Sequence, residues 1–206
     1  MRMLAVAVMA MLAGSPAASL TLDAAVLDEI NYARTQPQAY AQVLRDYRRS
    51  FRGLVVDDPA DPGYRTTVEG VRAVDEAIRF VERQPPLSPL AEAEVLTLAA
   101  VDHVAAQSRR GEVGHISADG GSPSDRVARR GGGVYVAETI AYGSNNPIAV
   151  VRQLIIDDGV ANRGHRAVIF DPRFRHAGVG CGPHPVYGSM CVVDFAATRD
   201  GRPAPR

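Results

Sequence analysis

The chain has 206 residues, 46% of them hydrophobic, and carries 23 basic and 23 acidic residues. This length suits one medium-sized domain with a sizeable core, and the hydrophobic content excludes general disorder. The basic residues are scattered among acidic ones and form no stripe, so nucleic-acid binding is not expected.

Residues 1–18 have the layout of a secretory signal peptide. A basic start at Arg2 precedes an apolar run up to Leu12, and small residues follow around Ala17 and Ala18. The run is too short to span a bilayer, and no later segment is long and apolar enough to do so. We therefore expect an exported protein, secreted or periplasmic, with no transmembrane segment.

The first half of the mature chain is predicted to be mostly helical. Apolar residues recur at helical spacing over residues 23–47, with a break at a proline, and again over residues 68–83. Between these helices, residues 50–66 are rich in Asp, Pro and Gly and predict an irregular surface excursion. Ser88 and the residues after it fit the start of a long helix, which is expected to end at Gly111.

The second half is predicted to contain the strands. Residues 134–142 alternate as in a strand, and residues 147–158 predict the last long helix. Two short strands around Cys181 and Cys191 predict a hairpin, and residues 199–206 form a polar tail. Because helices come first and strands cluster late, we expect an α+β domain with helices covering a small, largely antiparallel sheet.

The two cysteines are expected to form a disulfide. An even number of cysteines in an exported chain indicates pairing, and Cys181 and Cys191 face each other across the predicted hairpin. Closing so short a loop is expected to stabilise the fold by about 2.5–3 kcal/mol.

One carboxylate lies on an apolar strand face. Val136, Glu138 and Ile140 share a face at period two. A glutamate in a strand ordinarily points to solvent, but this pattern favours a buried or cavity position, where the carboxylate needs a partner.

The segment that follows the last long helix predicts one wall of a polar site. At about 100° per residue, Asp158 falls near the centre of the apolar helix face, whereas Asp157 falls on its polar side and is expected to be solvated. His165 is expected in a tight loop, and a neutral imidazole can serve as a metal ligand or a proton carrier near pH 7. His115, taken alone, is typical of a surface or capping residue.

Several short motifs follow one another in a specific order: Leu27 to Arg34, Leu87 to Leu90, Gly114-His115, Ala137 to Ile140, Gly164 to Arg166, and Ala177 to Gly180. Together with the final hairpin they resemble the CAP superfamily (cysteine-rich secretory protein, antigen 5 and pathogenesis-related-1; the SCP domain), particularly its bacterial secreted members. The resemblance covers a single domain over residues 20–198. Residues 50–83 look like an insertion in that domain.

The resemblance implies a three-layer α–β–α sandwich with a central cleft lined by two histidines and two acids. His115 and His165 match the histidines. Glu138 stands where the family usually has Gly-Glu-Asn. The second acid is usually a glutamate on the helix before the second histidine, and Asp158 is the nearest match.

Two imidazoles and a carboxylate suit zinc or another divalent ion, so His115, His165 and Glu138 are the expected metal ligands. The leading hypothesis is a secreted monomer whose cleft binds a small molecule, a lipid or a component of the cell envelope. An alternative is a metal-dependent or general-base hydrolase that uses the same cleft. In a third hypothesis, the polar side chains only form hydrogen bonds with one another inside a stable secreted scaffold and have no further role.

Overall fold

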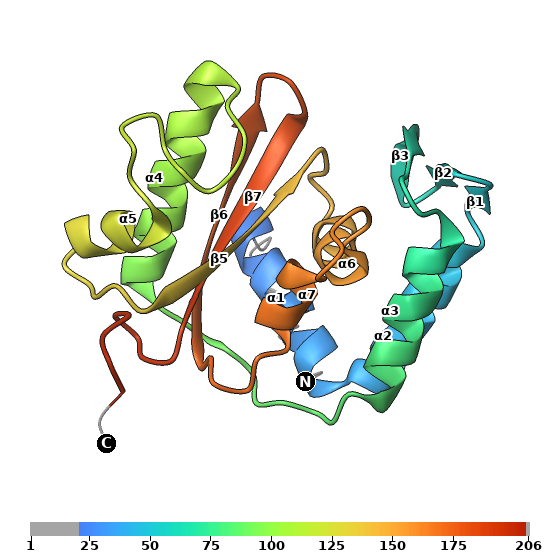
Figure 1. The fold of residues 1–206 in the computed structure, drawn as a ribbon, viewed down its shortest axis with the longest axis horizontal. Coiled ribbons are helices and arrows are strands. Elements are labelled where there is room, and N and C mark those ends of the chain that lie inside the picture. Colours follow the sequence, from blue (N-terminus) through green and yellow to red (C-terminus); the bar gives the residue numbers. More distant parts are fainter. Residues whose placement is uncertain (1–20, 205–206) are drawn as a thin grey trace, which may run out of the picture.

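The computed structural model describes residues 21–204, so the predicted signal peptide lies outside the described residues. The domain has three layers, a helix pair, a four-stranded sheet and a second group of helices, which confirms the predicted α–β–α sandwich (Figure 1). One face of the sheet is covered by α4 (Glu94–Arg110) and α5 (Pro123–Arg129), and the other by α1 (Leu22–Thr35), α6 (Pro147–Ile156) and α7 (Gly164–Ile169). Within residues 21–204, no helix is long and apolar enough to cross a membrane.

The main sheet is largely antiparallel, as predicted. Its order is β4 (Ala91–Glu92), β6 (His176–His184), β7 (Gly188–Ala196) and β5 (Val136–Tyr142), and only the β4–β6 pair is parallel. Cys181 and Cys191 are directly opposite each other in the β6–β7 hairpin and are joined by the predicted disulfide. A Cβ atom at Gly178 would lie 2.0 Å from the Thr97 nitrogen, so glycine in β6 lets α4 pack against the strand backbone.

Residues 50–83, the predicted insertion, which we call the insertion below, are more regular than predicted. Residues 50–66 are not an irregular excursion but a small antiparallel sheet of β1 (Phe51–Arg52), β2 (Val55–Asp58) and β3 (Asp61–Thr66). Tight turns explain the Asp, Pro and Gly content, and Gly53 adopts a left-handed φ of 66° at the first of them. Helix α3 (Val71–Arg83) follows as predicted and packs along α2 (Pro37–Arg48) beside the sandwich (Figure 1).

The long helix begins later than predicted. It starts at Glu94, six residues after Ser88, and the intervening chain is extended and includes β4. The Asn31 side chain explains this, because its Oδ1 accepts from the Leu90 nitrogen at 2.7 Å and its Nδ2 donates to the Leu90 carbonyl at 3.0 Å. A tertiary contact thus overrides the local helix-start pattern around Ser88.

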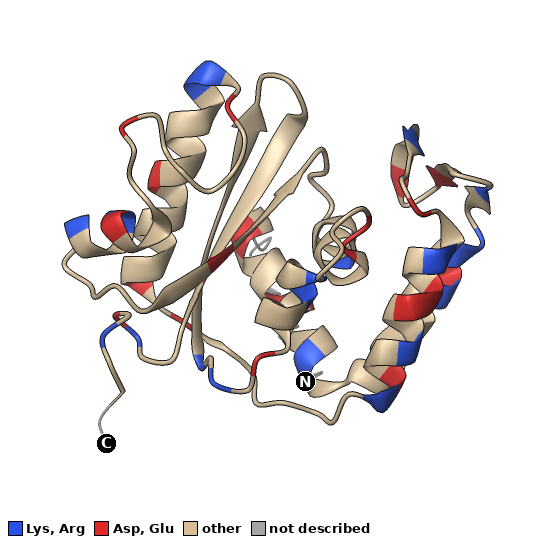
Figure 2. Cartoon of the chain, in the orientation of Figure 1, with Lys and Arg blue, Asp and Glu red and all other residues tan. Residues whose placement is uncertain are grey.

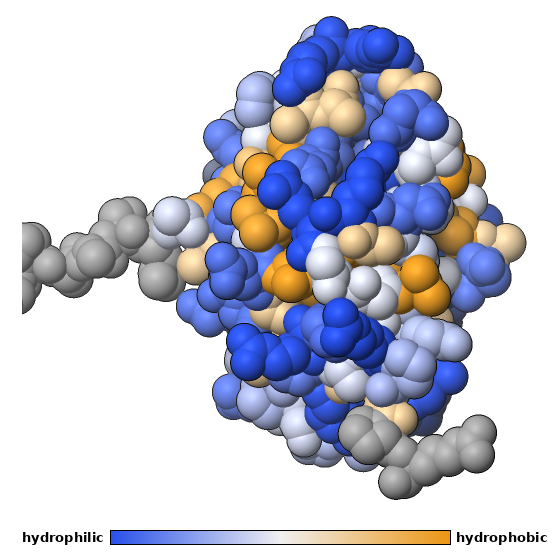
Figure 3. All heavy atoms as spheres, turned by 90° about the vertical axis from the view of Figure 1, so that its left-hand side faces the viewer, coloured by the Kyte–Doolittle hydropathy of each residue, from blue (hydrophilic) through white to orange (hydrophobic). Residues whose placement is uncertain are grey.

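Charges of both signs alternate over the surface, including along α2 and α3 (Figure 2). On the face over α4 and α5, hydrophobic side chains lie among hydrophilic ones (Figure 3). The largest hydrophobic cluster lies on the opposite side of the sheet and extends from it through α1, α6 and α7 to α2 and α3. This cluster holds α6 in the place from which it forms the floor of the site described next.

Candidate ligand-binding cleft

The first histidine of the cleft is held by Glu138 of β5. Glu138 is buried, and its Oε1 lies 2.8 Å from Nδ1 of His115. The period-two pattern of β5 therefore predicted this carboxylate correctly, both as buried and as partnered. His115 itself lies in the loop after α4, and its side chain is 47% exposed, so the ring remains open to the cleft.

The charge of Glu138 is balanced from behind. Its Oε2 accepts a hydrogen bond from the guanidinium of Arg126, a fully buried residue of α5 that also donates to the His115 carbonyl at 3.0 Å. Asp194 lies directly opposite Glu138 on β7, and burial together with the Glu138 charge raises the pKa of Asp194 well above its ordinary value. Burial therefore favours the neutral form of Asp194, and it is Glu138 that has the buried guanidinium of Arg126 as its partner.

The loop that carries His115 is fixed by a third histidine. His103 is fully buried on α4, and its Nε2 lies 2.9 Å from the Gly114 carbonyl, while its Nδ1 lies 3.0 Å from Oγ of Ser117. Gln107 donates to the same carbonyl at 2.7 Å. Burial lowers the pKa of His103 and so favours its neutral form, and the contacts of its ring are structural.

The second histidine is held by Asp157, and the preference for Asp158 was wrong. Oδ1 of Asp157 lies 2.6 Å from Nδ1 of His165, and its Oδ2 accepts from the His165 backbone nitrogen at 2.9 Å. Asp157 is only 3% exposed, not solvated as predicted. His165 lies in the first turn of the short helix α7 rather than in the predicted tight loop.

Backbone geometry explains the error. Asp157 is the C-cap of α6 and has a left-handed φ of 57°. The helix therefore ends before Asp157 and Asp158, and a rotation of about 100° per residue does not describe the directions of their side chains. The turn directs the Asp157 side chain to α7. It directs Asp158 toward the insertion, where the Asp158 carboxylate accepts from the nitrogens of Val68 at 2.6 Å and Glu69 at 2.8 Å.

A set of hydrogen bonds and ion pairs, which we call the latch, joins this turn to the insertion. Besides Asp158, it contains Glu69, which accepts from the Gly159 nitrogen at 2.9 Å and from Arg163 at 2.6 Å. Arg163 also donates to Glu76 of α3 at 2.7 Å. The Arg163 hydrogen bonds lower the pKa of Glu69 to about 2. The latch therefore fixes the residue just before Gly164 and His165 to the insertion.

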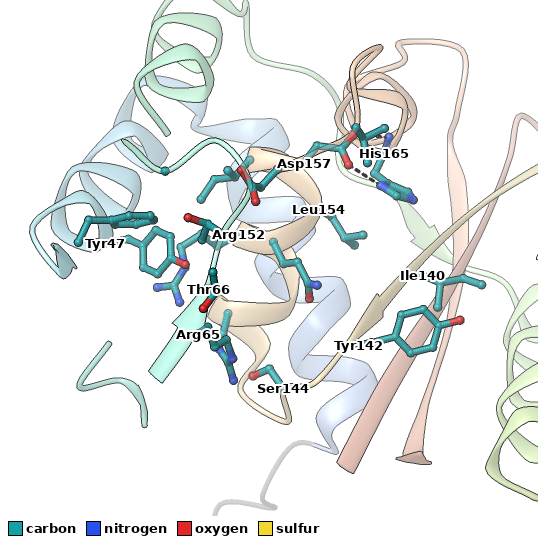
Figure 4. Close-up of a pocket in the computed structure, with 18 of the residues that line it drawn as sticks. Tyr47, Arg65, Thr66, Ile140, Tyr142, Ser144, Arg152, Leu154, Asp157 and His165 are labelled. Carbon is teal, nitrogen blue, oxygen red and sulfur yellow. Dashed lines mark hydrogen bonds and ion pairs between the residues drawn. The ribbon is translucent and has the colours of Figure 1, made fainter. Parts of the chain in front are cut away.

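Both histidines line one cavity of about 480 Å³. Their ring centroids are 6.4 Å apart. Helix α6 forms the floor of the cavity, Ile140 and Tyr142 of β5 line one side, and residues of the insertion and of α2 line the far end (Figure 4). Asp158 also lines this cavity without touching either histidine. The structure thus brings together the predicted histidines and Glu138, with Asp157 as the fourth member.

The same geometry decides which imidazole atoms face a ligand. A carboxylate accepts from Nδ1–H, which leaves Nε2 of a neutral imidazole with its lone pair. Within residues 21–204, no protein group is bonded to Nε2 of His115 or of His165. The cleft therefore offers two imidazole acceptors whose orientation is fixed by buried acids.

These residues fit a metal ion only in part. Both oxygens of Glu138 are already bonded, to His115 and to Arg126, so Glu138 stands behind the imidazole and not beside Nε2. Over the described range, no group of three or more His, Cys, Asp or Glu side chains is placed to hold a metal. Carboxylates bonded to the far nitrogen are nonetheless the usual support of metal-binding histidines.

Sequence reasoning missed Arg126 and Asp194 as members of the site. The sequence does contain a signal for Asp194. Met190, Val192 and Asp194 share a strand face at period two, which places a carboxylate on an apolar face as Val136 and Glu138 do on β5. No local pattern distinguishes Arg126 from the many other arginines of the chain.

The sequence of the chain matches a known protein family. The model of the CAP family, described as the cysteine-rich secretory protein family, matches residues 27–195. A crystal structure of an extracellular protein containing an SCP domain, from Bacillus anthracis str. Ames, is 23% identical over 60% of this chain with a TM-score of 0.44. The match spans 38% of that protein. Among curated proteins no match was found.

Proposed function

Because the chain belongs to the cysteine-rich secretory protein (CAP) family, we propose that it is an exported binding protein whose cleft holds a ligand against His115 and His165. The observation that carries this proposal is the pair of imidazoles, each fixed through Nδ1 by a buried carboxylate and each lining the same cavity. Its volume of about 480 Å³ is in the range of small-molecule sites. We place this activity outside the cell or in the cell envelope, in accordance with the predicted signal peptide.

The ligand is recognised through hydrogen-bond donors. In the neutral form of each imidazole, Nε2 is an acceptor when Nδ1–H donates to the carboxylate, so this form binds a hydroxyl or another donor group of the ligand. The carboxylates behind them are only slightly exposed. They therefore hold the rings in place without competing for the ligand.

A divalent ion such as zinc belongs to the same proposal. The two Nε2 atoms supply two ligands, and a metal site needs at least one more from water or from the bound molecule. The support is the carboxylate–histidine arrangement at both rings. When bound, the ion would supply an electrophilic centre for an oxygen of the ligand.

Histidine side-chain NMR of the purified protein tests the binding proposal. A ligand or Zn²⁺ that enters the cleft shifts the Nε2 resonances of His115 and His165 and leaves that of His176, which does not line the cavity, unchanged. The variants His115→Ala and His165→Ala should each weaken zinc binding, with His176→Ala as the matched control. Negligible zinc binding by all forms of the protein would contradict the proposed metal site. The absence of any ligand-induced shift of the histidine resonances would contradict the proposed binding function.

A hydrolase is the second candidate, favoured by one observation. The 2.6 Å Asp157–His165 contact has the form of a general base held by its orienting acid. Within residues 21–204, no hydroxyl or thiol is bonded to His165, so water would be the nucleophile. Ester, peptide and glycan substrates with His165→Ala as the control would reveal such activity. Turnover that is equal in both proteins would contradict it.

A further inference from the structure

The cavity continues past the histidines to a second, distal end. This end, which we call the distal subsite, is lined by Tyr47, Arg65, Thr66 and Arg152, and Gln153, the residue after Arg152, lines the same cavity. Figure 4 shows Tyr47, Arg65, Thr66 and Arg152 on the side of the cavity away from His165. Arg65 and Thr66 belong to β3 of the insertion, so the insertion forms part of the binding surface.

The charges of the distal subsite are already matched. Arg65 pairs with Asp61, and Arg152, whose side chain is only 7% exposed, pairs with Asp58. The Arg152 guanidinium also lies 3.7 Å from the centroid of the Tyr47 ring. An anionic ligand would meet only arginines that are already paired, together with the carboxylate of Asp158, which lines the same cavity, and would lose its hydration without compensation. The subsite therefore favours an uncharged ligand over an anionic one.

Neutral hydrogen-bonding groups remain free at the same place. Gln153 of α6 and Thr66 have exposed side chains, and in the described part of the chain neither side chain has a hydrogen-bonding partner. The amide and the hydroxyl can each both donate and accept. A hydrocarbon chain would remove water from these groups and give nothing in return. A ligand that carries hydroxyl groups would satisfy them.

The lining also has an apolar component. Phe51, Tyr142 and Leu154 border the same cavity as the polar groups. Aromatic and aliphatic surfaces pack against the apolar faces of a ring, while polar groups at its edge form hydrogen bonds. The combination of matched charges, free neutral groups and apolar walls is that of a site for a hydroxylated ring.

We propose that the distal subsite binds an uncharged sugar ring of a neutral oligosaccharide, whose other end reaches His115 and His165. This inference rests on the proposed function, because the imidazole acceptors take hydroxyl donors from the same ligand. The latch keeps the insertion and the His165 turn in a fixed relation, so the two ends of the site are held at a constant spacing. A preformed site of this kind loses little ordering entropy on binding.

Titration calorimetry and histidine NMR on the full mature protein test this inference. The probes are three neutral trisaccharides (maltotriose, cellotriose and tri-N-acetylchitotriose), the anionic trigalacturonate, and a lysophosphatidylcholine as the lipid comparison. At least one neutral trisaccharide should bind and shift His115 and His165. Gln153→Ala and Thr66→Val should each weaken that binding about fivefold, the effect of losing one neutral hydrogen bond.

A matched control is Gln42→Ala, an exposed glutamine of α2 that does not line the cavity and should leave the affinity unchanged. Binding of only the anionic or the lipid probe, with the histidine shifts, would overturn the sugar site and leave the proposed function standing. Saccharide binding that Gln153→Ala and Thr66→Val leave unchanged would overturn the distal subsite. The absence of any histidine shift with every probe would overturn both proposals.

Discussion

The two histidine–carboxylate pairs of the cleft look alike but are built differently. Glu138 projects from β5, the edge strand of the main sheet, is paired with the buried Arg126, and lies opposite Asp194, whose pKa is raised by burial. Asp157 is a helix C-cap in left-handed conformation, and it accepts both from Nδ1 and from the backbone nitrogen of His165. The first pair is embedded in the sheet, whereas the second is a local turn that is fixed from outside by the latch.

This difference predicts unequal consequences of damage. Removal of the acid at the sheet leaves a guanidinium buried without its counter-charge, which is costly. Removal of the acid at the turn leaves a half-exposed imidazole that water can reach, which costs less. Glu138 thus contributes both to the stability of the fold and to the site, whereas Asp157 contributes mainly to the orientation of His165.

The largest effect is expected for Glu138→Ala. Because Arg126 would lose its buried carboxylate, the free energy of unfolding should fall by about 3–5 kcal/mol. Urea denaturation measures this loss. The matched control is Glu82→Ala, which removes a pair with Arg45 whose side chains are both more than 40% exposed and should cost no more than about 1 kcal/mol. Equal losses in the two variants would contradict the buried role of Glu138.

Asp157 should show a smaller effect that can be divided into two parts. Asp157→Gly removes both hydrogen bonds to His165 but tolerates the left-handed backbone, and it should cost about 1–3 kcal/mol. Asp157→Ala should cost about 1 kcal/mol more because of its φ of 57°. In both variants the NMR signals of His165 should change and those of His115 should not. A change in both histidines would show that the two pairs are not independent.

Asp158→Ala should be milder still and should spare the histidines. The variant loses the acceptor for two backbone nitrogens of the insertion, which costs about 1 kcal/mol. The His165 signals should keep their positions, because Asp158 does not touch the ring. A change in the His165 NMR signals as large as the change in Asp157→Gly would show that Asp158 also orients this histidine.

The smallest effect at neutral pH is expected for Glu69→Gln, and it depends on pH. The pKa of Glu69 is lowered in the folded state from 4.5 to about 2, mainly by hydrogen bonds from Arg163. Its stabilisation is therefore complete above pH 4.5 and is lost as the pH falls through 2. At pH 7 the variant should lose less than about 1 kcal/mol, because the pair is partly exposed. Denaturation curves of the two proteins should converge near pH 2, and a constant difference would contradict this linkage.

The sequence predicted most of the fold for identifiable reasons. The α+β class, the Cys181–Cys191 disulfide and α3 follow from periodic apolar residues and turn chemistry, which act locally, whereas the three-layer sandwich was implied by the family resemblance. The start of α4 did not follow, because the side chain of Asn31, 59 residues away in the chain, binds the Leu90 backbone and keeps that segment extended. The sheet within the insertion was missed since its strands are short and rich in turn residues.

For the cleft, the sequence by itself determined His115, His165 and Glu138, because a strand with period two fixes which face a carboxylate occupies and the motif order identifies the histidines. Only the tertiary structure chose Asp157 over Asp158. That choice depends on one left-handed backbone angle at the end of α6, where helical periodicity no longer applies. The roles of Arg126 and the insertion depend on which elements pack against each other, and no local pattern in the chain encodes those contacts. The strand pattern of β7 marks Asp194, but its position opposite Glu138 depends on how β7 pairs with β5.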